Sequence, residues 1–120
     1  MNKKTLVATA VFVFLLVSSV WAIPPNNAVM QQYMKHRYIV FYVSGENWTI
    51  DFKHVVSYHF KEGSSPSEKL QFSNGNYIDF PARTPGRSQI DGSRTFSNVG
   101  EAWVEYLKVI AANPQLASIP

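Results

Sequence analysis

Short runs of β-branched and aromatic residues, separated by polar turns, fill the middle of the chain. Residues 37–43 (RYIVFYV) are apolar at nearly every position, which predicts a central strand. Residues 48–52 alternate apolar with polar side chains, and residues 55–60 follow as a third strand after a bend at residues 53–54. The turn at residues 44–47 is short, so we expect antiparallel pairing of the first two strands, because parallel pairing needs a long crossover.

A β-hairpin is predicted over residues 70–80, and its apolar pattern decides between two registers. A two-residue Asn-Gly turn would place the apolar residues of the two strands on opposite faces of the sheet. A three-residue loop at residues 73–75 pairs Leu70 with Ile78 instead, and the apolar side chains of both strands then share one face. Gly75 would take the left-handed backbone conformation that such loops require, so we predict the three-residue loop.

Two segments carry apolar residues at a helical period. Residues 28–36 predict a short helix, capped by Asn27 and apolar on the side that includes Tyr33. Asn98 opens a longer helix, with Glu101 three residues later as a variant of the capping box, and Asn113-Pro114 ends it. The apolar stripe of this second helix consists of Val99, Trp103, Tyr106 and Ile110, with Ala102 and Leu107 beside it.

These elements predict an α+β domain in which a small antiparallel sheet of four to five strands, a roll or a partly open barrel, is covered by the C-terminal amphipathic helix. The polar segment at residues 81–95 is expected to be irregular, with a weak hairpin around Asp91-Gly92 as the alternative. We divide the chain into an N-terminal segment (1–22), a linker with the short helix (23–36), the α+β domain (37–113) and a tail (114–120).

The first 22 residues have the three parts of a secretory signal: a start with two lysines, an apolar run and small residues at the exit. Cleavage after Ala22 would begin the mature chain at Ile23. The apolar run at residues 6–21 would span about 24 Å as a helix, short of the hydrocarbon core of about 30 Å. The alternative is an uncleaved membrane anchor. We expect a periplasmic or secreted domain in the first case and an inner-membrane anchor with the domain outside the cytoplasm in the second.

Composition narrows the class of protein further. The chain has no cysteine, which excludes a disulfide framework, a lipidated cysteine and thiolate metal sites. Small animal secreted domains usually depend on disulfides, so this absence favours a bacterial envelope protein. The chain has 11 basic and 8 acidic side chains, and two of the lysines lie within the first 22 residues. The near balance that remains does not indicate a nucleic-acid partner, which requires a concentrated positive field.

Asp51, His54 and Ser57 are the residue types of a hydrolase, but their spacing argues against a catalytic site. On a strand, a separation of three residues places His54 on the opposite face from the other two. His36, His54 and His59 are the only histidines, and their spacing does not match that of metal ligands. We expect the three histidines to be polar groups at the surface or at a sheet edge, with no metal and no cofactor bound.

The C-terminal helix carries two further candidates. Glu101 and Glu105 lie one helical turn apart, as paired catalytic carboxylates can. They lie opposite the apolar stripe, and Lys108 is close to Glu105 along the helix, so we interpret them as a solvated face. Trp103 is expected in the core, at the centre of the stripe.

Arg83, Arg87 and Arg94 are the leading candidates for a binding surface. They lie close together in a polar segment that contains only one acid, Asp91. Planar guanidinium groups suit carboxylate and phosphate recognition, and functional residues often lie on loops. We therefore expect an anionic ligand or lipid headgroup here, against the alternative of a solubilising loop. Trp48, at the start of a strand, is expected either to cap the core or to lie at a partner surface.

The favoured function is an exported, non-enzymatic envelope protein that acts as a small binding or assembly module for a protein partner in the envelope, soluble in the periplasm or tethered by its N-terminus. The alternative is an inhibitor or exclusion factor that occludes another envelope protein. A small hydrolase is the third hypothesis, and it requires polar groups that converge in a pocket. Contact with the membrane is expected only if the N-terminal segment is retained.

Overall fold

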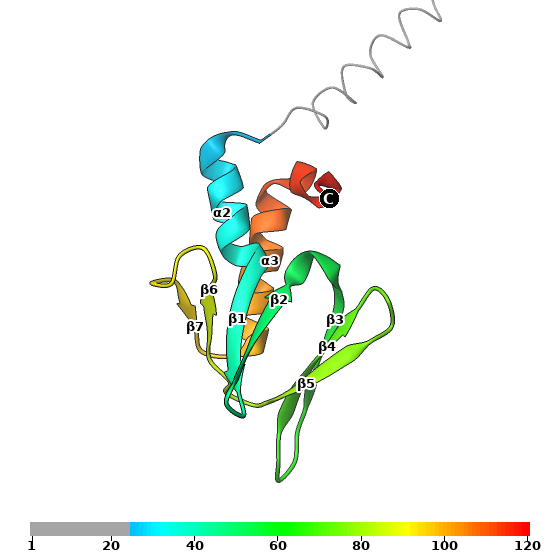
Figure 1. Cartoon of the computed structure of the whole chain (residues 1–120). Helices are drawn as coiled ribbons and strands as arrows, with labels where there is room; N and C mark the ends of the chain where they lie inside the picture. The colour runs from blue at the N-terminus through cyan, green and yellow to red at the C-terminus, as the bar shows by residue number, and fades with distance from the viewer. Residues whose placement is uncertain (1–24) are drawn as a thin grey trace, which may run out of the picture.

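The computed structural model describes residues 25–120 (Figure 1). The predicted signal sequence and its cleavage site between Ala22 and Ile23 lie outside the described residues. In chain order the elements are α2 (Asn27–Arg37), β1 (Tyr38–Val43), β2 (Glu46–Asp51), the 3₁₀ turn η1 (Phe52–His54), β3 (Val55–Lys61), β4 (Ser67–Phe72), β5 (Tyr77–Pro81), β6 (Gly86–Ser88), β7 (Thr95–Phe96), α3 (Val99–Ala112) and the 3₁₀ turn η2 (Pro114–Ser118).

The predicted α+β class is confirmed, with antiparallel strands and the C-terminal helix packed on the sheet. The strands divide between two sheets: a four-stranded sheet in the order β2-β1-β6-β7 and a three-stranded sheet in the order β3-β4-β5. Neither sheet closes into a barrel. Strands β6 and β7 join the five strands that the sequence predicted, and they form the weak hairpin that was considered around Asp91 and Gly92.

The two sheets separate at η1, which confirms the predicted bend after β2. The Asp51 side chain caps this turn by accepting a hydrogen bond from the Lys53 amide at 3.0 Å. Phe52, the first residue of the turn, is completely buried. Its ring centroid lies 6.3 Å from that of Phe41 on β1 and 5.8 Å from that of Tyr106 on α3, so this one side chain joins the four-stranded sheet to the C-terminal helix.

The β4–β5 hairpin has the predicted register. Leu70 pairs with Ile78, and the Phe72 amide donates to the Asn76 carbonyl at 2.8 Å, which leaves a three-residue loop. Gly75 has φ +89°, the left-handed conformation expected of it. The shared apolar face of the hairpin turns inward, and Leu70 is completely buried.

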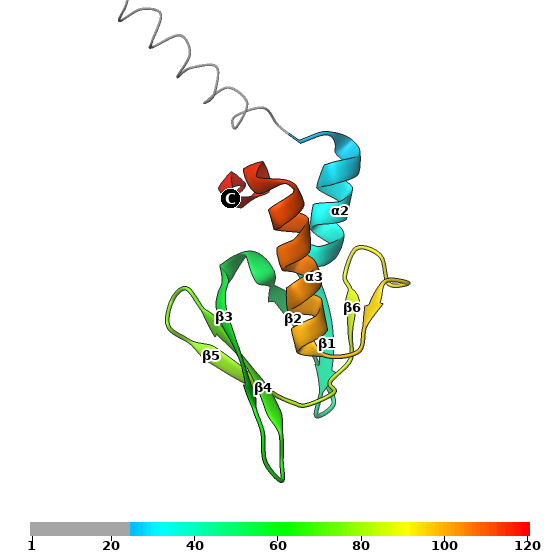
Figure 2. The same cartoon turned by 180° about the vertical axis from the view of Figure 1, so that it is seen from behind.

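Helix α3 lies behind the four-stranded sheet in Figure 1 and in front of it in Figure 2. Asn98 is its N-cap as predicted, accepting from the Glu101 amide at 2.8 Å. The apolar stripe is rotated relative to the prediction: Trp103 lies at its border, partly buried, and Leu107 is exposed. The buried positions of the helix are Val99, Ala102, Tyr106 and Val109.

Both ends of the described chain differ from the prediction. Helix α2 is capped by Asn26 rather than Asn27, and it extends through Arg37 before entering β1 without a loop. Residues 114–120, predicted as a tail, include η2, in which Leu116 is completely buried. The last carbonyl, of Pro120, accepts a hydrogen bond from Arg37 Nη1 at 2.9 Å, so the C-terminus is held against the end of α2.

No helix within residues 25–120 is long and apolar enough to cross a membrane.

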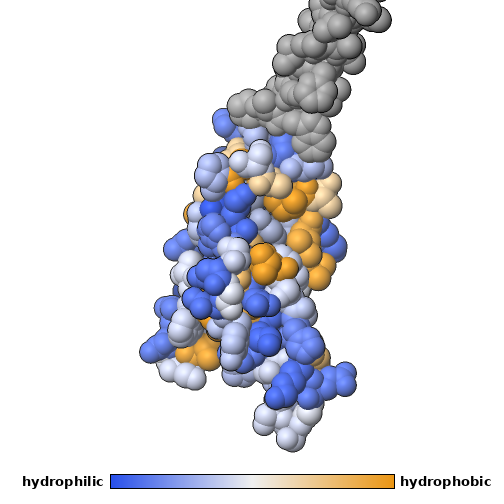
Figure 3. All heavy atoms as spheres, turned by 90° about the vertical axis from the view of Figure 1, so that its right-hand side faces the viewer, coloured by the Kyte–Doolittle hydropathy of each residue, from blue (hydrophilic) through white to orange (hydrophobic). Residues whose placement is uncertain are grey.

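On the face of the molecule seen in Figure 3, hydrophobic residues form separate areas divided by hydrophilic ones. Val104 and Leu107 of α3 are among the exposed apolar residues of the described part of the chain.

Candidate functional site

One face of the four-stranded sheet carries the candidate site. Directly paired residues of neighbouring strands share a face, and the inward residues of β1, such as Phe41, belong to the core. The next positions face the other way: Val40 pairs with Thr49 on β2 and with Arg87 on β6, and Tyr42 pairs with Asn47 on β2. Among the described residues no helix lies over this outer face, as Figures 1 and 2 show together.

The outer face is hollowed into a groove of about 300 Å³. We call it the sheet groove, and its lining residues are Val40, Tyr42, Asn47, Pro85, Gly86, Arg87 and Thr95. Tyr42 is 62% exposed, the highest fraction among the large hydrophobic residues described. The groove therefore combines an exposed aromatic ring with amide, hydroxyl and guanidinium groups.

Gly86 positions β6 beside β1 and so completes the groove. A Cβ atom on Gly86 would lie 2.5 Å from Phe41 Cε1, closer than real side chains allow. The Phe41 ring occupies the space that any larger residue would need. Without a side chain at position 86, β6 pairs closely with β1, and the following residue, Arg87, is placed opposite Val40 on the outer face.

Arg87 is the cation of the sheet groove. It lies between Val40 on β1 and Thr95 on β7 and is exposed. Within residues 25–120 its guanidinium makes no ion pair, and no acidic residue lines the groove. The acid closest in sequence, Asp91, pairs with Lys35 at 3.6 Å instead. Hydrogen bonds from Ser93, with a smaller contribution from Lys35, hold the pKa of Asp91 below its usual range.

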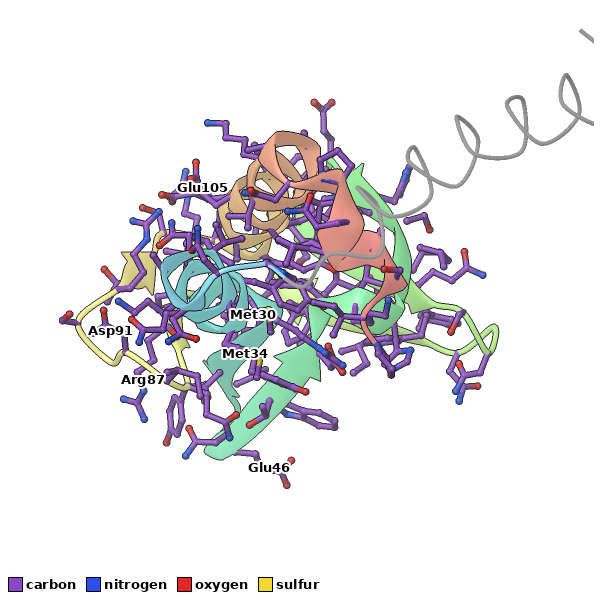
Figure 4. The ribbon with its side chains drawn as sticks, turned by 90° about the horizontal axis from the view of Figure 1, so that it is seen from above. Met30, Met34, Glu46, Arg87, Asp91 and Glu105 are labelled. Carbon is purple, nitrogen blue, oxygen red and sulfur yellow. The ribbon has the colours of Figure 1, made fainter. Side chains whose placement is uncertain are left out.

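Arg94 faces the other side of the sheet. Its Nη2 lies 3.4 Å from Glu105 Oε2 on α3, and its guanidinium lies 4.8 Å from the ring centroid of Phe96. Figure 4 places Glu105 and Arg87 on opposite sides of α2. Arg83 lies in the turn between β5 and β6, with φ +66°, and does not line the groove. Of the three predicted arginines, the structure thus brings only Arg87 into this site.

Trp48 belongs to a different surface from Arg87. It pairs with Phe41 and so lies on the inner side of β2, where it is 39% exposed. There it lines a smaller cavity of about 150 Å³, together with Glu46 and Asp79 and with apolar residues of β1 and β5. The four predicted partner-binding residues therefore do not form one site.

The three residues of the hydrolase hypothesis, Asp51, His54 and Ser57, are arranged differently from the prediction. The turn η1 brings His54 back toward Asp51, with Nε2 and Oδ2 3.6 Å apart, so the prediction that they face opposite ways is wrong. Asp51 is nevertheless held by Arg37, through Nε at 2.8 Å and Nη2 at 3.0 Å. The hydroxyl of Ser57 interacts with Gln71 at 3.3 Å instead of with the imidazole. A nucleophile-to-base contact is not formed between these residues.

The electrostatics of Asp51 fit a structural ion pair. Burial acts to raise the pKa of Asp51, but hydrogen bonds from Arg37 and from the Lys53 amide outweigh it, and the pKa lies below its usual value. The hydrogen bonds between Arg37 and Asp51 raise the pKa of Arg37, against the effect of its own burial. Both groups therefore stay charged as a fixed pair.

The glutamates of α3 also have structural partners. Glu101 Oε2 accepts from the Ser97 amide at 2.7 Å, just before the helix. Glu105 pairs with Lys108 at 3.1 Å as well as with Arg94. The predicted solvated face thus also ties the helix to Arg94 and Ser97, the residues on either side of β7.

The histidines do not share one environment. The prediction that all three lie at the surface or at a sheet edge is wrong for His36, which is buried and donates from Nδ1 to the Gln32 carbonyl at 2.8 Å. Its ring packs edge-on against Phe96. His54 and His59 are exposed, and His59 lies on the edge strand β3. In residues 25–120 no group of three His, Cys, Asp or Glu side chains is placed to hold a metal ion.

The sequence interpretation missed Tyr42, Asn47, Pro85 and Thr95 as site residues. Residues 37–43 are apolar at nearly every position, so an outward aromatic cannot be told from an inward one by pattern. Val40 and Tyr42 alternate with Ile39 and Phe41, which are buried. This alternation predicts that Val40 and Tyr42 face outward only when the inward face of the strand is already known.

Comparison with known proteins adds no relative: no family model, no curated protein and no solved structure matches this chain. The function is therefore argued from the geometry of the sheet groove and from the chemistry of its residues.

Proposed function

We propose that this chain is a non-catalytic binding module of the cell envelope and that it binds its partner with the sheet groove. The observation that carries the proposal is an uncovered sheet face on which Tyr42 is 62% exposed beside the exposed guanidinium of Arg87. Exposed faces of antiparallel sheets are usually polar, and exposed aromatic residues next to polar groups are typical of binding surfaces.

The non-catalytic part of the proposal is supported by the interactions that the candidate catalytic side chains make with other residues of the fold. Asp51 is bound by Arg37, Ser57 interacts with Gln71, and Glu105 is bound by Lys108 and Arg94. The Asp51–Arg37 pair joins β2 to α2, and the Glu105–Arg94 pair joins α3 to the residue before β7. The sheet groove itself is lined by no carboxylate, imidazole or thiol.

The envelope location is supported by the sequence alone. The first 22 residues have the charge, length and exit residues of an export signal, and the chain has no cysteine. A small exported domain without enzymatic groups is suited to capture a component of the envelope, either as part of an assembly or on its own.

Site-specific photocrosslinking in the native cells tests this proposal. A photoreactive phenylalanine analogue replaces Tyr42 in the groove or, as a matched control, Tyr77 on the three-stranded sheet, which is exposed to nearly the same extent at 60%. We expect position 42 to form a discrete crosslinked product with an envelope component and position 77 to form none. Equal products from both positions, or none from position 42, would contradict the proposal.

A further inference from the structure

We infer that the sheet groove binds a saccharide that carries a carboxylate group. This inference rests on the proposed function and names the ligand class of the same site. It follows from four features of the groove: its apolar walls, its side-chain hydrogen-bonding groups, its charge and its size.

The apolar walls come from Tyr42, Val40 and Pro85. Tyrosine offers a flat apolar ring with a polar hydroxyl at its tip, and exposed rings of this kind pack against other flat surfaces. A pyranose ring has an apolar face of C–H groups and a rim of hydroxyls. The exposed Tyr42 ring is thus matched to one face of a sugar unit.

Side chains supply hydrogen-bonding groups on the face of the sheet that forms the groove. Strand β1 pairs with β2 along its whole length and with β6 over Ile39–Phe41, so around Val40 its backbone amides and carbonyls are used by the two neighbouring strands. An extended peptide is usually recognised by free backbone groups at a sheet edge, and the paired strands at the centre of the groove, around Val40, offer none. The Asn47 amide, the Thr95 hydroxyl and the Arg87 guanidinium can instead pair with the hydroxyls of a sugar.

The charge of the groove selects an anionic ligand. Arg87 is the single charged residue that lines it, and the other lining residues are neutral. An arginine fork makes two parallel hydrogen bonds to one carboxylate, and both become stronger where water is partly excluded. One cation is complementary to one carboxylate on a sugar unit, whereas a densely phosphorylated ligand would require several cations.

The size of the groove limits the bound portion of the ligand. A volume of about 300 Å³ is at the lower end for ligand pockets. It accommodates one or two sugar units, and because the groove is open on the sheet face, a longer chain can continue beyond it.

Binding is measured by applying the purified exported protein to an array of oligosaccharides. The array holds uronic-acid, muramic-acid and sialic-acid sugars, the same sugars with the carboxylate reduced to an alcohol, and acidic peptides. We expect at least one carboxylated sugar to bind about tenfold more tightly than its reduced form. Absence of binding to every carboxylated sugar, equal binding of the reduced forms, or binding of the acidic peptides alone would overturn the inference.

Substitutions of groove residues test whether the ligand binds in the sheet groove. Arg87→Gln is expected to weaken binding of the preferred sugar about tenfold and to abolish the difference from its reduced form. Tyr42→Ala is expected to weaken both forms, because the ring contact does not depend on charge. Arg83→Gln is the control, since Arg83 is an exposed arginine outside the groove, and it should change binding less than twofold. An equal loss in Arg83→Gln and Arg87→Gln would contradict the assignment.

The failure of this inference can be told from failure of the proposed function. If position 42 crosslinks to a protein and no saccharide binds, the groove is a binding site and the ligand class is wrong. If neither result is obtained, both proposals fail. The melting temperature of each variant, compared with that of the original chain, identifies any loss that comes from unfolding.

Discussion

The carboxylate of Glu68 on β4 accepts a hydrogen bond from the backbone amide of Gly100 in the first turn of α3, with Oε1 and N 3.0 Å apart. The same oxygen accepts from the Tyr58 hydroxyl at 2.6 Å, and the Glu68 residue is only 3% exposed. The first amides of a helix lack partners within the helix, and a negative charge is favoured near them. Glu68 thus anchors the three-stranded sheet to the start of the helix that covers the core.

We expect Glu68→Gln to destabilise the fold by about 1–3 kcal/mol, because it removes a charge from the helix N-terminus and places a buried NH2 group at the position of Oε2, which has no hydrogen-bond partner. Urea unfolding followed by circular dichroism measures the change. Glu62→Gln, at an exposed position in the neighbouring turn, is the control and should be close to neutral. Equal stability of the two variants would show that Glu68 does not hold the helix in place.

Gly100→Ala tests how closely the helix approaches the sheet. Alanine would favour the helix by up to about 1 kcal/mol, but a Cβ atom here would lie 2.7 Å from the Tyr58 hydroxyl oxygen. We therefore expect a net destabilisation of about 1–3 kcal/mol. Gly92→Ala has open space around it and should be nearly neutral in the same thermal unfolding experiment. A stabilised Gly100→Ala variant would contradict the close packing.

The ion pair between Arg37 and Asp51 predicts a dependence of stability on acid. The pKa of Asp51 is lower in the folded chain than in the unfolded chain, where it is about 4. The pair therefore contributes its full stabilisation above about pH 4, and this contribution is lost as the pH falls through the pKa of Asp51 in the folded chain. Asp51→Asn should cost about 2–4 kcal/mol at neutral pH and should flatten the decline of stability below about pH 4. The free energy of unfolding, measured between pH 2 and pH 7, checks both effects. A parallel decline in the two proteins would be evidence against the pair.

Trp103 and Leu107 allow the packed side of α3 to be compared with its exposed side. Trp103 stacks on Tyr106, with centroids 5.9 Å apart, and lies 5.9 Å from Phe52. Leu107 is 43% exposed. We expect Trp103→Ala to cost about 3 kcal/mol and Leu107→Ala less than about 1 kcal/mol, measured by chemical unfolding. Equal costs would mean that the helix packs with a different face.

Local patterns in the sequence were sufficient for much of the fold. The register of the β4–β5 hairpin follows from the period of its apolar residues and from Gly75, which takes the left-handed conformation without steric cost. The start of α3 follows from Asn98, whose side chain satisfies a free amide of the first turn. These features depend on neighbours within a few residues, so they can be read before the fold is known.

Features that depend on distant residues could not be predicted in this way. The burial of Leu116 requires the core to be assembled first, and a single apolar residue in a polar stretch gives no periodic signal. The division into two sheets depends on the environment of Phe52, which contacts residues of β1 and α3.

The candidate site was predicted in part, through Arg87. The expectation that three nearby arginines act together did not account for strand alternation, which turns Arg94 toward α3 and Arg87 toward solvent. Tyr42 was hidden in a strand that is apolar on both faces. The groove is lined by residues of four strands, so it depends on how the strands pair, and the pattern within a single strand does not predict it.

Hydroxyl-radical footprinting of the protein in its native envelope is the most direct test of the claim that the outer face of the four-stranded sheet is a binding surface. Tyr42 and Tyr77 are 62% and 60% exposed, so both should be modified at similar rates in the purified protein. In the envelope we expect Tyr42 to be protected about tenfold while Tyr77 remains reactive, because a bound partner excludes water from the groove. Unchanged reactivity of Tyr42 in the envelope would contradict the account.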